Sequence, residues 1–361
     1  MVVLLLVGCG GGGSTPPPPP PPPEISVTLT CVDHIQIAVT SANYTCAPTV
    51  SNTTNTAVTW SVDNSALATV ANGVLTPNST TTGTVKVTAT SAADTTKSAS
   101  VTVNVVDWIL LDLPLAYTGI ISSDGTGATT ILSLPESSTG GCFNADWMAD
   151  HLSFVCASDI GNYFFIYRTN GAAGGATLTT QVGVPSLGAP NSPSPSPDGK
   201  SLVFIAIDGT KGAEGVYKIN VDGSGLQLLD QEASCSGACP GIDQARYSFD
   251  GTKIVYTHLE GLQTYICVMN ADGTNKSCLV AGHNGAFSKD GTTIFFTASD
   301  GVHSISVNGG TASSLIVAGS NAISSPNGLK LVFETSTGIS TAYVDGSGQQ
   351  LLVGSAHLGS W

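Results

Sequence analysis

A short turn motif recurs through the second half of the chain and constrains its fold more than any other feature. Each copy reads Ser-x-Asp-Gly or Ser-x-Asn-Gly and leads into an apolar run, and successive copies lie about 37 to 52 residues apart. A decayed copy, Met148–Val155, precedes the four clear ones at 196–204, 248–256, 288–296 and 325–333. Because Asp-Gly favours tight turns, each copy predicts a turn followed by a buried strand.

A second hairpin follows each clear copy of the motif. Its turn contains another Asp-Gly or Asn-Gly pair, which starts at Asp222, Asp272, Asn308 or Asp345. Two hairpins per step give four strands, and four-stranded sheets repeated at this spacing are the blades of a β-propeller. The stretch from Trp108 lacks an innermost strand, whereas His357–Trp361 matches the beginning of a repeat. We therefore expect both ends of segment 107–361 to complete one blade of six, which removes exposed sheet edges.

The repeats closely resemble those of TolB-type propellers. The family repeat reads Trp-Ser-Pro-Asp-Gly, an apolar strand, then Ile-Tyr-Val-Met-Asn-Ala-Asp-Gly and a closing Leu, and Tyr265–Gly273 follows its second half closely. The resemblance covers the whole of segment 107–361 and implies a six-bladed propeller. TolB is a periplasmic partner of other envelope proteins, although kinship of fold alone does not transfer that role.

The preceding segment, 24–106, has the alternation of a β-sandwich. Apolar and polar residues alternate in 84–90 and 99–105, which predicts strands with one buried face. Asn72-Gly73 between two short apolar runs predicts a two-residue hairpin. From Trp60 to the final Val-x-Val-x-Val strand, the segment resembles the group 2 bacterial immunoglobulin-like domains. That resemblance implies an all-β sandwich that acts as a spacer, with Trp60 buried inside it.

The N-terminus resembles a bacterial lipoprotein signal. Leu6–Cys9 matches the lipobox at every position, which implies a signal peptide over residues 1–8, cleavage before Cys9 and lipidation of its thiol. No Lys or Arg precedes the short apolar run, so we expect the natural start to lie upstream. The Gly and Pro runs predict a tether over residues 9–23. No apolar run reaches the roughly 18 residues of a membrane-spanning helix. We therefore expect membrane attachment through the lipid alone, in the bacterial cell envelope, facing the periplasm or the cell surface.

The other cysteines form apparent pairs. A hairpin turned at Asp272-Gly273 places Cys267 opposite Cys278, and the midpoint of Cys142 and Cys156 falls at another predicted turn. No Cys-x-x-Cys spacing is present, so disulfides are favoured over metal ligation and indicate an oxidising compartment. The predicted disulfides join Cys31 with Cys46, Cys142 with Cys156, Cys235 with Cys239, and Cys267 with Cys278.

Charge and motifs narrow the function. The chain has 11 Lys and Arg against 25 Asp and Glu, a net charge of −14, which excludes nucleic-acid binding because no basic stripe can form. No hydrolase, metalloprotease, Walker or dinucleotide motif is present. We therefore expect a non-enzymatic envelope lipoprotein without a cofactor, whose propeller binds a protein or glycan partner. A polysaccharide lyase or hydrolase and a purely structural envelope component remain the alternatives.

The repeat register nominates residues at the mouth of the propeller channel. The position four before the first residue of the Trp-Ser-Pro-Asp-Gly motif should lie there, together with His258 and Glu260 of a neighbouring loop. This position is occupied by Phe143, Asn191, Asp243, His283, Ser320 and His357. The candidate ligand-binding residues are Asn191, Asp243, His258, Glu260, His283 and His357. We predict no metal site, because no His-x-His or similar close pair occurs, and the same groups are also typical of a solvated rim.

Overall fold

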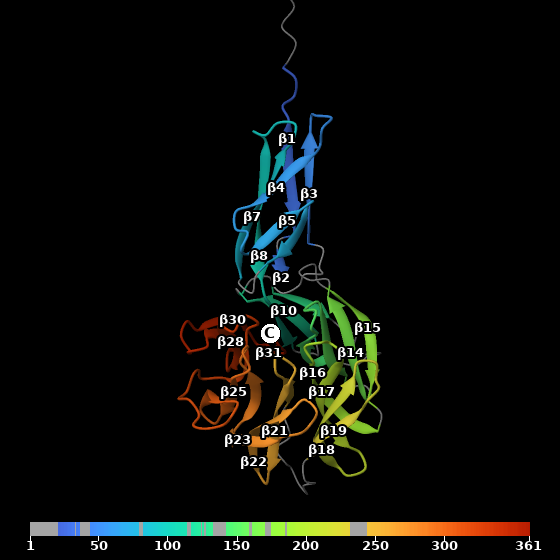
Figure 1. Cartoon of the computed structure of the whole chain (residues 1–361), viewed down its shortest axis with the longest axis vertical. Coiled ribbons are helices and arrows are strands. Elements are labelled where there is room, and N and C mark those ends of the chain that lie inside the picture. The colour runs from blue at the N-terminus through green and yellow to red at the C-terminus, as the bar shows by residue number, and fades with distance from the viewer. Residues whose placement is uncertain are drawn as a thin grey trace, which may run out of the picture.

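The chain is an all-β protein. The structure, a computed structural model, describes residues 21–32, 34–36, 44–78, 82–113, 117–123, 125, 128–132, 142–158, 161–169, 175–184, 186–231 and 244–361. These residues form strands, turns and loops, and none of them lies in a helix. Among them, therefore, no helix exists that could cross a membrane. Figure 1 shows an elongated N-terminal part beside C-terminal sheets that are arranged around a common centre.

The N-terminal part consists of two four-stranded sheets. The first contains, in order across the sheet, β1 (Ser26–Cys31), β3 (Tyr44–Ser51), β6 (Val74–Pro77) and β5 (Ala68–Ala71). The second contains β2 (His34–Gln36), β8 (Ser98–Val106), β7 (Gly83–Ser91) and β4 (Val58–Val62). One apolar cluster, which includes Leu75, Val85 and Val103, joins the two sheets, because alternate residues of each strand face inward.

Local sequence signals in this part are confirmed. Asn72 and Gly73 connect β5 and β6 with φ angles of 51° and 79°, the left-handed pair that a two-residue hairpin turn requires. Trp60 packs against the core but is only partly buried, so its expected burial is met in part. A Cβ atom on Gly73 would lie 3.2 Å from the Trp60 ring, which leaves room only for glycine at this turn.

The C-terminal part of the described chain contains six sheets, numbered here in chain order. The first combines β11 (Thr129–Leu132), β10 (Tyr117–Ser122) and β9 (Trp108–Leu113) with β31 (His357–Leu358). The second is β12 (Cys142–Trp147), β13 (Ser153–Ser158), β14 (Tyr163–Thr169) and β15 (Ala176–Gly183). The third is β16 (Leu187–Pro195), β17 (Ser201–Asp208), β18 (Ala213–Asn220) and β19 (Gln227–Gln231).

The remaining sheets follow the same order. The fourth is β20 (Ala245–Tyr247), β21 (Lys253–Glu260), β22 (Gln263–Asn270) and β23 (Ser277–Ala281). The fifth is β24 (His283–Phe287), β25 (Thr293–Ala298) and β26 (Gly301–Ser306). The sixth is β27 (Ser320–Ser324), β28 (Lys330–Thr335), β29 (Gly338–Tyr343) and β30 (Gln350–Gly354). Each sheet thus runs outward from its first strand, except that the first sheet takes its inner strand, β31, from the end of the chain.

Successive sheets pack face to face through buried apolar clusters. Between the second and third sheets, for example, the rings of Phe164 and Phe204 meet edge to face with their centroids 4.9 Å apart. A further cluster joins the sixth sheet to the first, through residues such as Val332 and Ile109. Figure 1 shows the sheets around a common centre, where residues of the inner strands line two cavities; we call this space the channel.

The repeated motif forms the same turn in each clear copy. The motif serine donates a hydrogen bond to the side chain of Asp or Asn two residues later, as in Ser196 Oγ to Asp198 Oδ1 at 2.6 Å. The same carboxylate accepts the backbone N–H two residues further on. Hydrogen bonds to the ionised form hold the pKa of these turn carboxylates below the usual range. Turn chemistry therefore accounts for the Asp-Gly pairs.

Three of the predicted disulfides are confirmed: Cys31–Cys46, Cys142–Cys156 and Cys267–Cys278. Cys267 lies directly opposite Cys278, as the hairpin register predicts. Cys142, in contrast, lies opposite Ser158, because the turn between β12 and β13 centres between Asp150 and His151 and not at the midpoint of the two cysteines, and the disulfide to Cys156 is diagonal. Cys9, Cys235 and Cys239 lie outside the described residues.

Candidate functional site

Four inner strands carry a bulge at one and the same repeat position. The pairing register of β12, β16, β24 and β27 shifts there. The bulged residues have left-handed backbones, with φ of 50° at Asn144, 48° at Ser192, 54° at Asn284 and 50° at Asn321. Asparagine tolerates this conformation better than most residues with a side chain, which accounts for three of the four. The backbone therefore selects short polar side chains at this level of the channel.

These side chains line one end of the channel, where a cavity of about 310 Å³ opens. We call it the mouth cavity. Each of the six sheets contributes the residue at the same repeat position, and four of the six are carboxamides. The six residues are Asn144, Ser192, Gln244, Asn284, Asn321 and Leu358. The repeat thus presents a ring of hydrogen-bonding groups, each carboxamide with one donor group and one acceptor.

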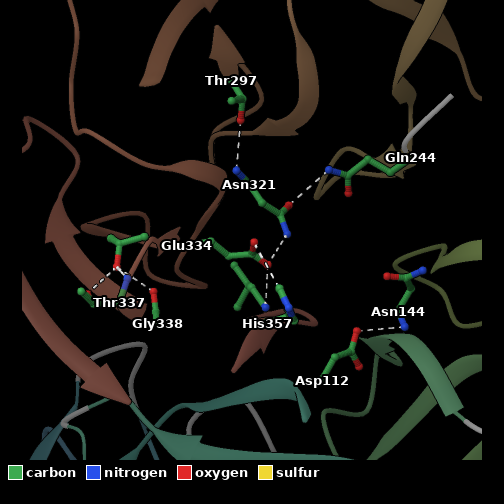
Figure 2. A network of polar contacts seen from close by, with 11 residues as sticks. Asp112, Asn144, Gln244, Thr297, Asn321, Glu334, Thr337, Gly338 and His357 are labelled. Atoms are coloured by element: carbon green, nitrogen blue, oxygen red, sulfur yellow. Dashed lines mark hydrogen bonds and ion pairs between the residues drawn. The ribbon is translucent and has the colours of Figure 1, made fainter. Parts of the chain in front are cut away.

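A hydrogen-bonded network joins this ring to the C-terminal strand (Figure 2). Glu334 of β28 accepts the backbone N–H of Leu358 at 2.8 Å and the Asn321 side-chain amide at 3.4 Å. Asn321 in turn accepts a hydrogen bond from Gln244 Nε2 at 3.3 Å. Polar contacts therefore run across the mouth from the sixth sheet to the edge of the fourth, and they hold β31 in place.

The first sheet adds a second carboxyl group beside the network. Asp112 of β9 accepts the backbone N–H of Asn144 at 2.9 Å, as Figure 2 shows. Burial raises the pKa of Asp112 to about 6, and the charge of Glu334 acts in the same direction, while backbone hydrogen bonds oppose the rise. His357 lies opposite Asp112 in the strand register and within 3.7 Å of Glu334, with 81% of its side chain exposed. Asp112 is therefore a weaker acid than an ordinary aspartate.

A largely buried ion pair, with 16% of each side chain exposed, forms the floor of the mouth cavity. Arg246 Nη1 lies 3.7 Å from Asp146 Oδ2, and Arg246 Nε donates to Gln244 Oε1 at 2.5 Å. Burial raises the pKa of Asp146, and the Arg246 charge opposes that rise. Asp146, Ser194 and Arg246 also line a second cavity further along the same strands. The ion pair therefore separates two ends of one channel.

The structure brings only some of the predicted residues to this site. Asn191 lines the mouth cavity and accepts the Asn144 side-chain amide at 2.6 Å. His283 and His357 each directly precede a lining residue. His258 lies elsewhere, 3.4 Å from Asp230 of β19, and Glu260 is exposed at the end of β21. Asp243 lies outside the described residues.

Sequence reasoning missed the ring itself. The position nominated from the sequence is the one just before the bulged residue, because a bulge shifts which side chains face the channel. The sequence does contain a signal for the ring, since Asn occurs in three copies of the repeat at the position after the nominated one. Asp146 and Arg246 share one repeat position, but the other copies have Ser194, Ala286, Ile323 and Ser360 there, so no recurring residue type marked it. Asp112 and Glu334 lie at other positions and carried no such signal either.

The donor set of the mouth is one of amides, carboxylates and a guanidinium. Among the described residues, no group of three His, Cys, Asp or Glu side chains could hold a metal ion. The arrangement can hold a ligand through hydrogen bonds, because carboxamides offer donors and acceptors without charge.

Comparison with solved structures shows the fold. TolB from Acinetobacter baumannii is 20% identical over 76% of this chain and 78% of its own, with a TM-score of 0.51. A putative TolB from Agrobacterium tumefaciens is 17% identical over 64% and 86%, with a TM-score of 0.51. This chain contains a TolB-like β-propeller. At these identities the likeness concerns the fold alone.

Other comparisons add little. An oligogalacturonate lyase in complex with manganese is 14% identical over 65% of this chain and 69% of its own. Its TM-score of 0.44 is too low to carry an argument about activity. No family model and no curated protein matches the chain. The residues that line the mouth cavity are therefore the basis for a proposed function.

Proposed function

We propose that this chain is a non-enzymatic envelope lipoprotein whose TolB-like propeller binds a protein partner at the mouth cavity. The observation that carries the proposal is the ring of carboxamides at one repeat position. A side-chain carboxamide has the same donor and acceptor groups as a peptide unit, so it can pair with an exposed backbone segment. Protein recognition also agrees with the TolB-like fold. A glycan, which offers hydroxyl groups, is the other ligand class of this proposal.

The wider architecture belongs to the same proposal. The pairing of β31 with β9 and the cluster between the sixth and first sheets support a closed propeller of six blades over residues 107–361. The two N-terminal sheets support an immunoglobulin-like spacer over residues 24–106. Lipidation of Cys9 and a Gly/Pro tether would attach this body to a membrane of the cell envelope. Three disulfides agree with an oxidising compartment.

Anchoring and binding are tested separately. A Cys9→Ser variant expressed in a bacterium should leave the membrane fraction and fail to incorporate labelled palmitate, whereas retention with the label would contradict lipidation.

Partner binding is tested by capture from solubilised envelope with Asn284→Gly. Glycine keeps the left-handed backbone at this position while it removes one amide of the mouth. Asn275→Gly is the matched control, because Asn275 has the same φ of 54° but lies in an outer hairpin. We expect an envelope protein to be captured by the wild type and by Asn275→Gly, and at least about tenfold less by Asn284→Gly. Equal capture by all three would reject the mouth as the binding site, and loss upon glycosidase treatment would indicate a glycan.

A further inference from the structure

The second cavity of the channel differs from the mouth in its walls. It has a volume of about 220 Å³ and begins where the mouth cavity ends, at Asp146 and Arg246. We call it the far-end cavity. Its walls include aromatic rings from several sheets, namely Trp147, Tyr247, Phe249, Phe287 and Trp361. The far end can therefore accept an apolar group, which the mouth cannot.

Two residues of this cavity depart from the repeat motif. His151 occupies the position at which all four clear copies have glycine, and its φ is 47°. A histidine there strains the backbone, whereas glycine does not. Lys289 occupies the position at which two copies have Pro197 and Pro326. Both residues line the far-end cavity, and turn formation accounts for neither of them.

One polar atom at this end lacks a partner. His151 Nδ1 is buried without a hydrogen bond, whereas the indole N–H of Trp361 and the carboxyl group of Asp107 face each other. Trp361 is only 7% exposed and lines the cavity. Buried polar groups are normally satisfied, so unsatisfied ones around a cavity indicate a molecule that pairs with them.

One basic side chain at the far end has no ion-pair partner among the described residues. Lys289 Nζ lies 4.4 Å from the centroid of Phe249, and no described carboxylate forms an ion pair with it. Arg246 is already paired with Asp146. The ionised aspartates of the motif turns, Asp250 and Asp290, directly follow the lining residues Phe249 and Lys289, and burial raises the pKa of Asp107 to about 8. Lys289 is therefore a cation at the cavity wall that can pair with an anion.

We propose that the far-end cavity binds a small organic carboxylate. Its carboxylate group would pair with Lys289 and accept a hydrogen bond from His151, while its apolar body packs against the aromatic walls. Carboxylate oxygens suit this set because Lys289 and His151 both present donors. The aromatic walls favour an organic acid over inorganic phosphate, which has no apolar surface. The site is independent of partner binding at the mouth.

Calorimetric titration of the full chain with benzoate at pH 7 tests the site. Lys289→Gln removes the charge, and His151→Gly restores the glycine of the other copies, so it should fold. Lys200→Gln is the matched control, because it removes an exposed lysine of another motif turn whose partner is Asp198. We expect the wild type and Lys200→Gln to bind benzoate equally. Lys289→Gln and His151→Gly should each weaken binding at least about tenfold, the usual effect of losing one charge-assisted hydrogen bond.

Three results would overturn the proposal. Absence of benzoate binding to the wild type would do so, as would equal affinity in all four proteins. Inorganic phosphate binding as tightly as benzoate would show an anion site without the proposed apolar component. A crystal structure grown with benzoate gives an independent reading, because ordered water alone beside His151 Nδ1 would mean that water satisfies this atom.

Discussion

The two ends of the channel obtain their chemistry in opposite ways. At the mouth, polar side chains follow the repeat, since one position in each sheet supplies the ring and a bulge favours asparagine there. At the far end, the notable residues break the repeat, with His151 in place of glycine and Lys289 in place of proline.

Because of this difference, residues at the mouth and residues at the far end give unequal support for a binding site. Asn284 and Asn321 fit a left-handed bulge for structural reasons, so their presence alone does not establish binding. His151 has a structural cost and an unpartnered buried nitrogen. In a repeat protein, residues that follow the repeat are explained by the fold. Residues that depart from the repeat and destabilise the fold are better candidates for ligand binding. Experiments on stability can separate the two cases.

Asp107, beside the far end, should give the largest effect. Burial raises its pKa from 3.8 to about 8. Since the folded-state pKa is the higher one, its contribution to stability is complete below about pH 4 and is lost as the pH rises to about 8. This shift corresponds to a loss on the order of 5 kcal/mol. Asp107→Asn should therefore flatten the pH dependence of the free energy of unfolding and exceed the wild type at pH 8.

Urea unfolding between pH 4 and 9 measures this effect. Asp345→Asn is the control, because Asp345 lies in an exposed turn and its pKa is lowered by hydrogen bonds from Ser347. That variant should keep the wild-type slope between pH 5 and 8. If Asp107→Asn also keeps the slope, the carboxyl group is ionised in the folded protein and adds a negative charge beside the far end.

The boundary between the ends depends on Arg246. Arg246→Met would leave Asp146 buried without its cation, which typically costs about 3–5 kcal/mol. The double variant Asp146→Asn/Arg246→Met should recover most of the free energy of unfolding, because no charge is then left unpaired. Denaturant unfolding at pH 7 measures both. A loss below about 1 kcal/mol in the single variant would mean that solvent already reaches the pair and that the two cavities are continuous.

Glu334 should have a smaller effect, confined to the mouth. Glu334→Ala removes the acceptor of the Leu358 N–H, and a buried unpaired donor costs about 1–3 kcal/mol. Glu334→Gln keeps an acceptor oxygen and should lose less. Amide hydrogen exchange at Leu358 should accelerate in the Ala variant only. Equal exchange in both variants and the wild type would show that pairing with β9 alone holds the C-terminal strand.

The fold of this chain was largely readable from its sequence because its signals are local. Asp-Gly turns, alternating strands and the Asn72-Gly73 hairpin depend on neighbouring residues, and the structure contains each of them. The pairing of Cys267 with Cys278 followed from a turn in the same hairpin. The exact centre of a turn was harder to predict, and the turn between β12 and β13 lies further along the chain than the midpoint of Cys142 and Cys156.

The site was less readable because it is assembled across sheets. A bulge moves the channel-facing side chain by one position, so the register nominated His283 where Asn284 lines the cavity. The ion pair between Arg246 and Asp146 joins two sheets, and the spacing of these residues along the chain does not predict it. The unpartnered nitrogen of His151 is likewise a property of burial, which only the folded structure defines.

Substitution by glycine at both ends of the channel tests whether His151 strains the backbone more than Asn284 does. His151→Gly and Asn284→Gly each place glycine at a left-handed residue, with φ of 47° and 54°. At His151, relief of backbone strain should exceed the entropy cost of glycine and stabilise the protein by up to about 1 kcal/mol. At Asn284 the two effects should nearly cancel, because asparagine tolerates this conformation. Thermal and urea unfolding measure both, and a destabilised His151→Gly would mean that histidine supports the turn, so that its departure from the motif is structural after all.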